Sequence, residues 1–241
     1  MSIMEKAIVF DVQGEYALFK KPYSPLSPVS FPVPPPTAIF GMVGAIAGFG
    51  KDEYLERMND GDVKVGIRLL KPIRRYRAGL NVLTTKNSKY FRPDKKGPRT
   101  QVPFEFIVNP AYRIYFVHSS SIVREPLLQQ LKSGKTVYTP CLGVAQCIAD
   151  VEYVGSFPVE KIAQRGKHSL NCVIPLTTTG ADVHYATGRK FMRFSVPARM
   201  GLDRTVTHYE DIVVDEDACE EGVSVTVKGF ERIGSDEILL F

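Results

Sequence analysis

The residues best suited to chemistry in this chain are the cations gathered between Lys64 and Arg99. That window holds twelve Lys and Arg residues and a single acid, Asp94, so it carries a formal charge of +11. The whole chain of 241 residues carries only +5, which leaves −6 for the rest. Cations neutralise phosphates, and the rings of Tyr90 and Phe91 can stack on splayed bases. The pattern predicts a site for a polyanion such as RNA, with a solvated basic loop as the alternative.

The residues predicted to contact RNA form two groups. Four arginines would line the base of the basic segment, and the remaining residues would hold phosphates or support the strand at its tip. The first group is Arg68, Arg74, Arg75 and Arg77, and the second is Lys86, Lys89, Tyr90, Phe91, Arg92, Lys95, Lys96 and Arg99. Each phosphate neutralised on a single strand should add about −0.7 to the slope of log affinity against log salt.

Acid–base catalysis has weaker support from the residue types. The histidines are His118, His168, His184 and His208, with Lys167 before the second and Tyr185 after the third. A metal-free ribonuclease could use such groups as acid and base, but neighbours in sequence need not converge in space. No Walker A loop, zincin motif or GxSxG motif is present.

Metal and cofactor sites are not predicted. The four cysteines form no CxxC pair and none has a histidine at ligand spacing, so reduced thiols in a cytoplasmic protein are expected. An acidic stretch from Glu210 to Glu221 could serve a two-metal site only if the fold gathered its carboxylates. A solvated hairpin or a face for a basic partner is the simpler interpretation. Neither a signal peptide nor a membrane span of about 20 apolar residues is recognisable.

The order of predicted elements indicates the scaffold that positions these residues. The expected strands and helices are a strand at Lys6–Val12, a helix at Ala38–Gly48 that Thr37 could cap, a short helix at Asp52–Met58, a strand at Val63–Leu70, hairpin arms at Gly79–Thr85 and Thr100–Val108, a strand at Tyr112–Val117, a helix at Ser121–Lys132 and a strand at Cys147–Val154. This is the order of a ferredoxin-like, RNA-recognition-motif (RRM) domain, predicted over residues 1–155 with a hairpin thumb at about 79–108.

The C-terminal part, residues 156–241, is predicted to be smaller and β-rich. Its expected strands are Asn171–Leu176, Arg189–Val196, Tyr209–Val214, Val223–Lys228 and Ile238–Phe241. The predicted fold class is therefore α+β.

The first helix carries glycines at helical spacing. Gly41, Gly44 and Gly48 share one face, opposite a face with Ile39 and Met42. The apolar face would cover a sheet, whereas the glycines would let another backbone come close. Packing within the chain, RNA and a neighbouring subunit are the three candidate uses of this face.

Four segments resemble the Cas-five family of CRISPR-associated RAMP proteins. They are FDVQGEYALFKK, FPVPPPTAIFGMVGAIAG, RTQVPFEFIVNPAYRIYF and TPCLGVAQC, in the family's order across residues 10 to 147. The resemblance implies a subunit of a type I Cascade surveillance complex in antiviral defence, with a length most like type I-B. Such subunits cap the 5′ handle of the CRISPR RNA beside the Cas-seven backbone subunit and the large subunit, and meet target DNA indirectly. Their thumb folds over the RNA and kinks it.

One branch of that family, in type I-C systems, cleaves precursor RNA with a tyrosine and a Lys-His pair. Here Phe49 stands near the tyrosine's place and Ser119, Ser120 and Ser121 occupy the region of the Lys-His pair. Phenylalanine cannot exchange a proton, so a binder without catalytic residues is predicted. A metal-independent endoribonuclease and a structural adaptor that binds an acidic protein remain the alternatives.

Overall fold

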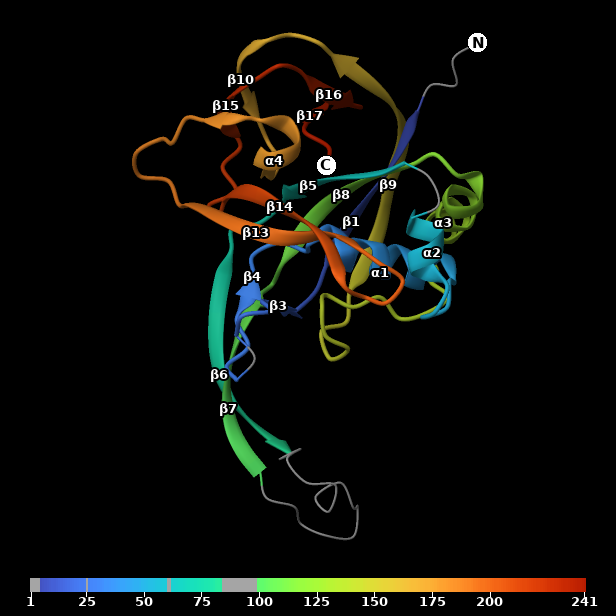
Figure 1. Cartoon of the computed structure of the whole chain (residues 1–241), viewed down its shortest axis with the longest axis vertical. Coiled ribbons are helices and arrows are strands. Elements are labelled where there is room, and N and C mark those ends of the chain that lie inside the picture. The colour runs from blue at the N-terminus through green and yellow to red at the C-terminus, as the bar shows by residue number, and fades with distance from the viewer. Residues whose placement is uncertain (1–4, 25, 60–61, 84–98) are drawn as a thin grey trace.

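A six-stranded antiparallel sheet forms the centre of the molecule (Figure 1). The computed structural model describes residues 5–24, 26–59, 62–83 and 99–241. The strand order is β17-β16-β9-β1-β8-β5. Its four core strands are β1 (Lys6–Gln13), β5 (Val63–Leu69), β8 (Ala111–His118) and β9 (Asp150–Ile162). The first and third strands of the βαββαβ unit are central, which confirms the predicted ferredoxin-like α+β fold.

Three helices belong to the same unit: α1 (Pro36–Ala47), α2 (Tyr54–Asn59) and α3 (Ser121–Ser133). The prediction that Thr37 caps the first helix was wrong, because the helix already begins at Pro36. Proline is tolerated there since a first-turn amide has no partner inside the helix. The hydroxyl of Thr37 donates instead to the carbonyl of Pro197, 3.3 Å away. The helix therefore starts where the proline run ends and is tied to a C-terminal strand.

The strand β1 is apolar on both faces because it lies between two layers. Ile8 and Phe10 point to the helices, and Ala7 and Val9 point to the opposite side. The second side packs against C-terminal residues such as Val225. The sheet is thus covered on both faces along this strand.

The C-terminal part does not stand apart from the sheet. The boundary expected between residues 155 and 156 falls inside β9, and β16 and β17 extend the first sheet. The strand predicted at Asn171–Leu176 is wrong for most of its length, since only the two residues of β11 pair and α4 follows at once. The bounds are β10 (Gly166–Leu170), β11 (Ile174–Pro175), α4 (Leu176–Thr179), β12 (Asp182–Val183), β13 (Phe191–Met200), β14 (Val206–Asp215), β15 (Val223–Val227), β16 (Phe230–Ile233) and β17 (Asp236–Ile238).

The edge of β5 is covered by Phe241. The amide of Phe241 donates to the carbonyl of Val65 at 3.0 Å, and the amide of Val65 donates back at 2.9 Å. Beside this pair, a Cβ on Gly66 would lie 2.7 Å from Ile238 and 3.1 Å from Leu240. The final residues therefore lie against a glycine that leaves room for them.

A long hairpin extends from this body between the second and third core strands (Figure 1). Its arms are β6 (Arg74–Leu83) and β7 (Arg99–Val108), paired without a break from Arg74 opposite Val108 to Leu83 opposite Arg99. The first arm begins five residues before the predicted start at Gly79. The short strand β2 (Tyr16–Ala17) pairs with the base of β7, and β3 (Phe19–Lys20) pairs with β4 (Ser30–Phe31).

The tip of the hairpin lies outside the described residues. It includes seven of the residues predicted to contact RNA: Lys86, Lys89, Tyr90, Phe91, Arg92, Lys95 and Lys96. These stay predictions from the sequence. In the described part of the chain, no helix is long and apolar enough to cross a membrane.

Candidate nucleic-acid interface

The two faces of the hairpin differ because opposite residues of an antiparallel pair share a face. Tyr76 lies opposite Phe106, and Ala78 lies opposite Phe104. The rings of Phe104 and Phe106 are stacked with centroids 5.9 Å apart, and Tyr16 meets Phe106 edge-on at 5.8 Å. Tyr76 is 52% exposed. We call Tyr16, Tyr76, Phe104 and Phe106 the aromatic face.

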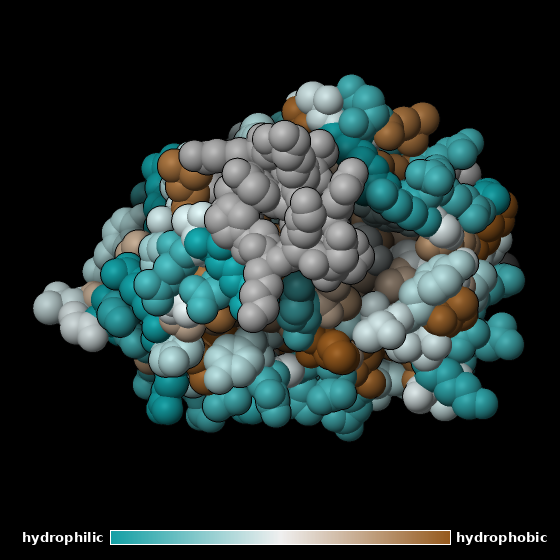
Figure 2. Space-filling view, turned by 90° about the horizontal axis from the view of Figure 1, so that it is seen from below, coloured by the Kyte–Doolittle hydropathy of each residue, from teal (hydrophilic) through white to brown (hydrophobic). Residues whose placement is uncertain are grey.

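The aromatic face was missed in the sequence, although its signal was present. Phe104 and Phe106 alternate with Glu105, and Tyr76 lies between two arginines, so a period of two marks both arms. Rings on such a surface can stack on unpaired bases. Viewed from the hairpin end, the molecule has hydrophilic surface interrupted by separate hydrophobic patches (Figure 2).

Three of the predicted cations remain open to solvent on the described arms. Arg74 is exposed and lies on the same side of the ribbon as Tyr76. Arg77 has an 80% exposed side chain, although its Nε donates to Glu105 at 3.0 Å. Arg99 is exposed at the far end of the ladder. Arg74 therefore combines with the stacking rings on one side of the ribbon, as a single-stranded nucleic acid requires, whereas Arg77 and Arg99 lie on the opposite side.

Arg75 and Arg68 are already occupied by carboxylates of the chain itself. Arg75 Nη1 donates to Glu216 Oε2 at 2.8 Å, and Nη2 donates to the other oxygen of the same carboxylate. The hydrogen bond to Glu216, which is 2% exposed, raises the pKa of Arg75. Arg68 Nη1 donates to Asp236 at 2.7 Å, on the sheet rather than the hairpin. These two arginines therefore have a structural use.

The carboxylates from Glu210 to Glu216 are also bound by partners within the protein. The Glu210 carboxylate accepts from the amides of Thr177 and Thr178 at 2.6 and 3.0 Å. Asp215 pairs with Arg189, and Glu216 pairs with Arg75. No group of His, Cys, Asp and Glu suited to a metal occurs among the residues that the structure describes. The carboxylates are therefore spread over separate partners instead of converging.

The four histidines lie on different elements and have local partners. His118 Nδ1 accepts from the amide of Ser120 at 3.0 Å. His168 lies 4.9 Å from the ring of Phe230, and His184 lies 2.8 Å from the hydroxyl of Thr226. None of these contacts joins a histidine to a lysine or tyrosine.

The glycines of α1 are mostly approached by the chain itself. A Cβ on Gly44 would lie 2.9 Å from the Cβ of Tyr54, at the start of α2. Gly48 ends the helix with a φ of +93°, and Val137 would lie 3.0 Å from its Cβ. Gly41 has nothing within 4 Å and is the one of the three left with open space.

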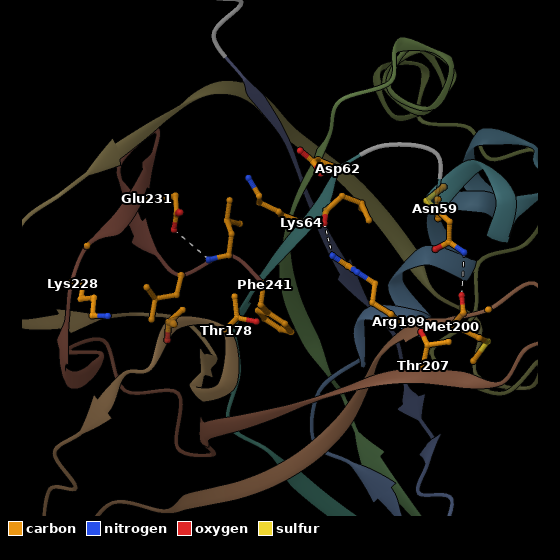
Figure 3. Close-up of a pocket in the computed structure, with 17 residues that line it drawn as sticks. Asn59, Asp62, Lys64, Thr178, Arg199, Met200, Thr207, Lys228, Glu231 and Phe241 are labelled. Carbon is orange, nitrogen blue, oxygen red and sulfur yellow. Dashed lines mark hydrogen bonds between the residues drawn. The ribbon is translucent and has the colours of Figure 1, made fainter.

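A cavity of about 830 Å³ lies where α2 and the start of β5 face the C-terminal strands (Figure 3). Arg199 reaches across it and donates to the carbonyl of Val63 at 2.7 Å. Lys64 and Lys228 on its wall are balanced by Asp62 and Glu231. Among the described lining residues there is neither a histidine nor a tyrosine, so the cavity offers no acid–base pair of the kind expected for a metal-free ribonuclease.

The sheet surface that an RRM uses for RNA is not exposed on the central strands of this protein. An RRM stacks bases on the sheet face opposite its helices. Here that face of β1 and β8 carries Val9, Tyr115 and Val117, which are at most 2% exposed beneath Leu170 and Val213. The hairpin is therefore the described surface that best combines exposed cations with aromatic rings.

A βαββαβ core with a long hairpin between its second and third strands defines a RAMP-like protein. The sequence profile of the family described as "CRISPR-associated protein (Cas_Cas5)" matches residues 7–217. The chain therefore belongs to the CRISPR-associated Cas5 family, which confirms the resemblance found in its sequence.

Solved structures share the fold at low sequence identity. The "Crystal structure of a CRISPR protein from Archaeoglobus fulgidus" aligns with a TM-score of 0.60 and 15% identity over 97% of this chain and 98% of that one. A chain of the "Type III-B Cmr-beta bound to cognate target RNA and AMPPnP" assembly aligns with a TM-score of 0.50 and 9% identity, over 91% and 86%. At such identities the likeness concerns the fold alone. No curated protein sequence matches the chain.

Proposed function

We propose that this protein is a non-catalytic RNA-binding subunit of a type I Cascade surveillance complex, most like type I-B, in the cytoplasm. It caps and kinks the 5′ handle of the CRISPR RNA. It contacts the Cas-seven backbone subunit and the large subunit, and meets target DNA only through the assembled complex.

The hairpin is the observation that carries this proposal. Arg74 presents an exposed guanidinium group on the same side as the aromatic face, and Arg77 presents one on the opposite side, on an element that extends from the body (Figure 1). Phosphates would meet the cations while unstacked bases lie on Tyr76, Phe104 and Phe106. A strand held in this way bends, because its bases and its backbone are drawn to different sides of the ribbon.

Replacing Arg74 with glutamine and Tyr76 with alanine together is expected to weaken binding of the 5′ handle roughly 10- to 100-fold. The change removes one stacking ring, worth about 1–3 kcal/mol, and one phosphate contact. Fluorescence anisotropy with labelled handle RNA measures the loss. Lys135→Gln with Tyr138→Ala is the matched control, since Tyr138 is also 52% exposed but lies after α3. Equal losses in the two double variants would contradict the assignment of the hairpin.

Repeat RNA incubated with the purified protein in chelator is expected to stay intact. The reason is that Phe49 offers no exchangeable proton, and the contacts of His168 and His184 are with Phe230 and Thr226. Gel analysis of end-labelled RNA measures this directly. A single defined cut that the purified protein alone produces would replace the binder with the metal-independent endoribonuclease.

The alternative function, a structural adaptor that binds an acidic protein, predicts a different behaviour of the complex. Assembly with the Cas-seven subunit and the large subunit would then survive ribonuclease treatment, with no RNA in the purified material. In the binder proposal the complex contains CRISPR RNA and loses this subunit when the handle is digested.

A further inference from the structure

A second basic groove lies far from the hairpin, between α3 and the strands β1 and β9 (Figure 1). Its volume is about 410 Å³. A water occupies about 30 Å³ in the liquid, so the groove has room for a ligand much larger than one small anion. The lining residues are Lys6, Ile8, Arg124, Glu125, Leu128, Lys132, Tyr153 and Ser156.

The helix side of the groove follows from residue spacing. Arg124, Leu128 and Lys132 are four residues apart on α3 and therefore share one stripe of the helix. Lys6 faces this stripe from the start of β1. The three cations surround an apolar floor made by Leu128 and Ile8.

The strand side depends on a β-bulge. The register of β1 and β9 shifts between Val9 and Phe10, so Phe10 lies opposite Tyr153 while Ile8 lies opposite Ser156. A bulge re-aims side chains, and here it turns two residues that are three apart toward the same helix-covered side. Burial raises the pKa of Tyr153, which keeps its hydroxyl protonated as a donor at neutral pH. The ring and hydroxyl of Tyr153 and the hydroxyl of Ser156 thus line the groove together with the cations.

The charges of the groove are unbalanced. Lys6, Arg124 and Lys132 take part in none of the ion pairs found in the described part of the chain, and Glu125 is the single acid on the lining. Arg124 Nε is buried and has no hydrogen-bond acceptor among the described residues. Leaving a buried charged donor without an acceptor is unfavourable, and an anionic ligand would supply the missing acceptor.

We propose that this groove is a second nucleic-acid site, which binds the phosphates of a single strand and stacks a base on Tyr153. Three cations beside an aromatic ring favour a phosphodiester chain, since a carboxylate peptide would leave the ring without a partner. The site does not depend on the hairpin, because α3 lies on the side of the body, away from the hairpin of β6 and β7 (Figure 1).

The test uses the full chain with two of the hairpin contacts removed, so that binding at the groove is a larger share of the total. In the background of Arg74→Gln with Tyr76→Ala, residual binding of 20-nucleotide RNA and DNA probes is measured by anisotropy across a salt series. Adding Arg124→Gln and Lys132→Gln is expected to lower affinity for the preferred probe a further 10- to 30-fold at about 0.1 M salt and to reduce the salt slope by about 1.4. Glutamine keeps the helix propensity nearly unchanged.

Lys135→Gln with Lys167→Gln removes the same charge from exposed positions outside the groove lining. Equal effects of the two pairs would overturn the proposal. The proposal would also be overturned if polyglutamate bound as tightly as the oligonucleotides and the same groove substitutions weakened its binding. The ligand would then be an acidic protein segment.

Photocrosslinking of the unmutated protein to thiouridine-containing RNA keeps the test independent of any variant's folding. Crosslinked peptides from α3 or from β9 around Tyr153 are expected. Crosslinks confined to the hairpin would overturn the second site while leaving the first intact.

Discussion

Replacing Arg75 with methionine is expected to lower the free energy of unfolding by about 3–5 kcal/mol. The change leaves the carboxylate of Glu216, which is 2% exposed, without its two-pronged partner. The substitution of the partner, Glu216→Gln, should lower the free energy of unfolding by less. Arg75 then still has Glu105 at 3.7 Å, and the Arg75 side chain is 26% exposed to solvent. Urea denaturation followed by circular dichroism measures both losses.

Arg74→Met is the matched control for that prediction. Arg74 is the preceding residue, is exposed, and belongs to no ion pair of the described chain. Its stability should stay within about 0.5 kcal/mol of the parent protein. Its RNA affinity should fall, because it is the cation proposed to meet phosphate. Equal destabilisation by the two substitutions would show that the carboxylate contact does not distinguish these arginines.

Replacing Gly143 with alanine is expected to destabilise the protein by about 2–5 kcal/mol. The φ of Gly143 is +97°, and a Cβ there would lie 2.1 Å from the carbonyl oxygen of Leu18. Left-handed backbone costs a side chain about 1–2 kcal/mol, and forced overpacking adds about 1–3 kcal/mol. The approach is fixed by the bond from the amide of Leu18 to the carbonyl of Leu142, at 3.0 Å. Thermal and urea unfolding give the magnitude.

Gly41→Ala provides the opposite case on α1. Gly41 has nothing within 4 Å and lies inside the helix, so alanine should stabilise the protein by about 1 kcal/mol. The same variant probes the open side of the helix. If Gly41→Ala stabilises the protein but impairs assembly of the complex, a neighbouring subunit or RNA lies at Gly41. If assembly is normal, Gly41 makes no such contact.

The core of the fold could be predicted because its signals are local and repeated. Alternation at Tyr112–Val117 and helical spacing at Ser121–Lys132 each report a buried face, and the structure has β8 and α3 there. The predicted ends of both helices also lie close to the observed ends, where Gly48 and Gly134 follow the last helical residue with positive φ. Such patterns depend on nearest neighbours in one element.

What could not be predicted depends on partners distant in the chain. Arg75 looks like any other cation of the basic window, and only the fold brings Glu216 to it across 141 positions. The strand pairing of the last residues is equally invisible, because Phe241 bonds to Val65 through backbone atoms alone. The aromatic face depends on the register between β6 and β7, which brings Tyr76 opposite Phe106.

The bond between Arg75 and Glu216 also has a consequence for the order of events during protein synthesis. The amide of Ile73 donates to the carbonyl of Glu216 as well, at 2.8 Å, so the base of the hairpin is held twice by one distant residue. A ribosome makes residues 73–75 long before residue 216, and domains fold as their parts emerge. Before residue 216 is synthesised, the base of the nascent hairpin is held from the N-terminal side by the pairing of β2 with β7, but it lacks its contacts to Glu216. We therefore expect capture of RNA in its final orientation to require synthesis as far as residue 216.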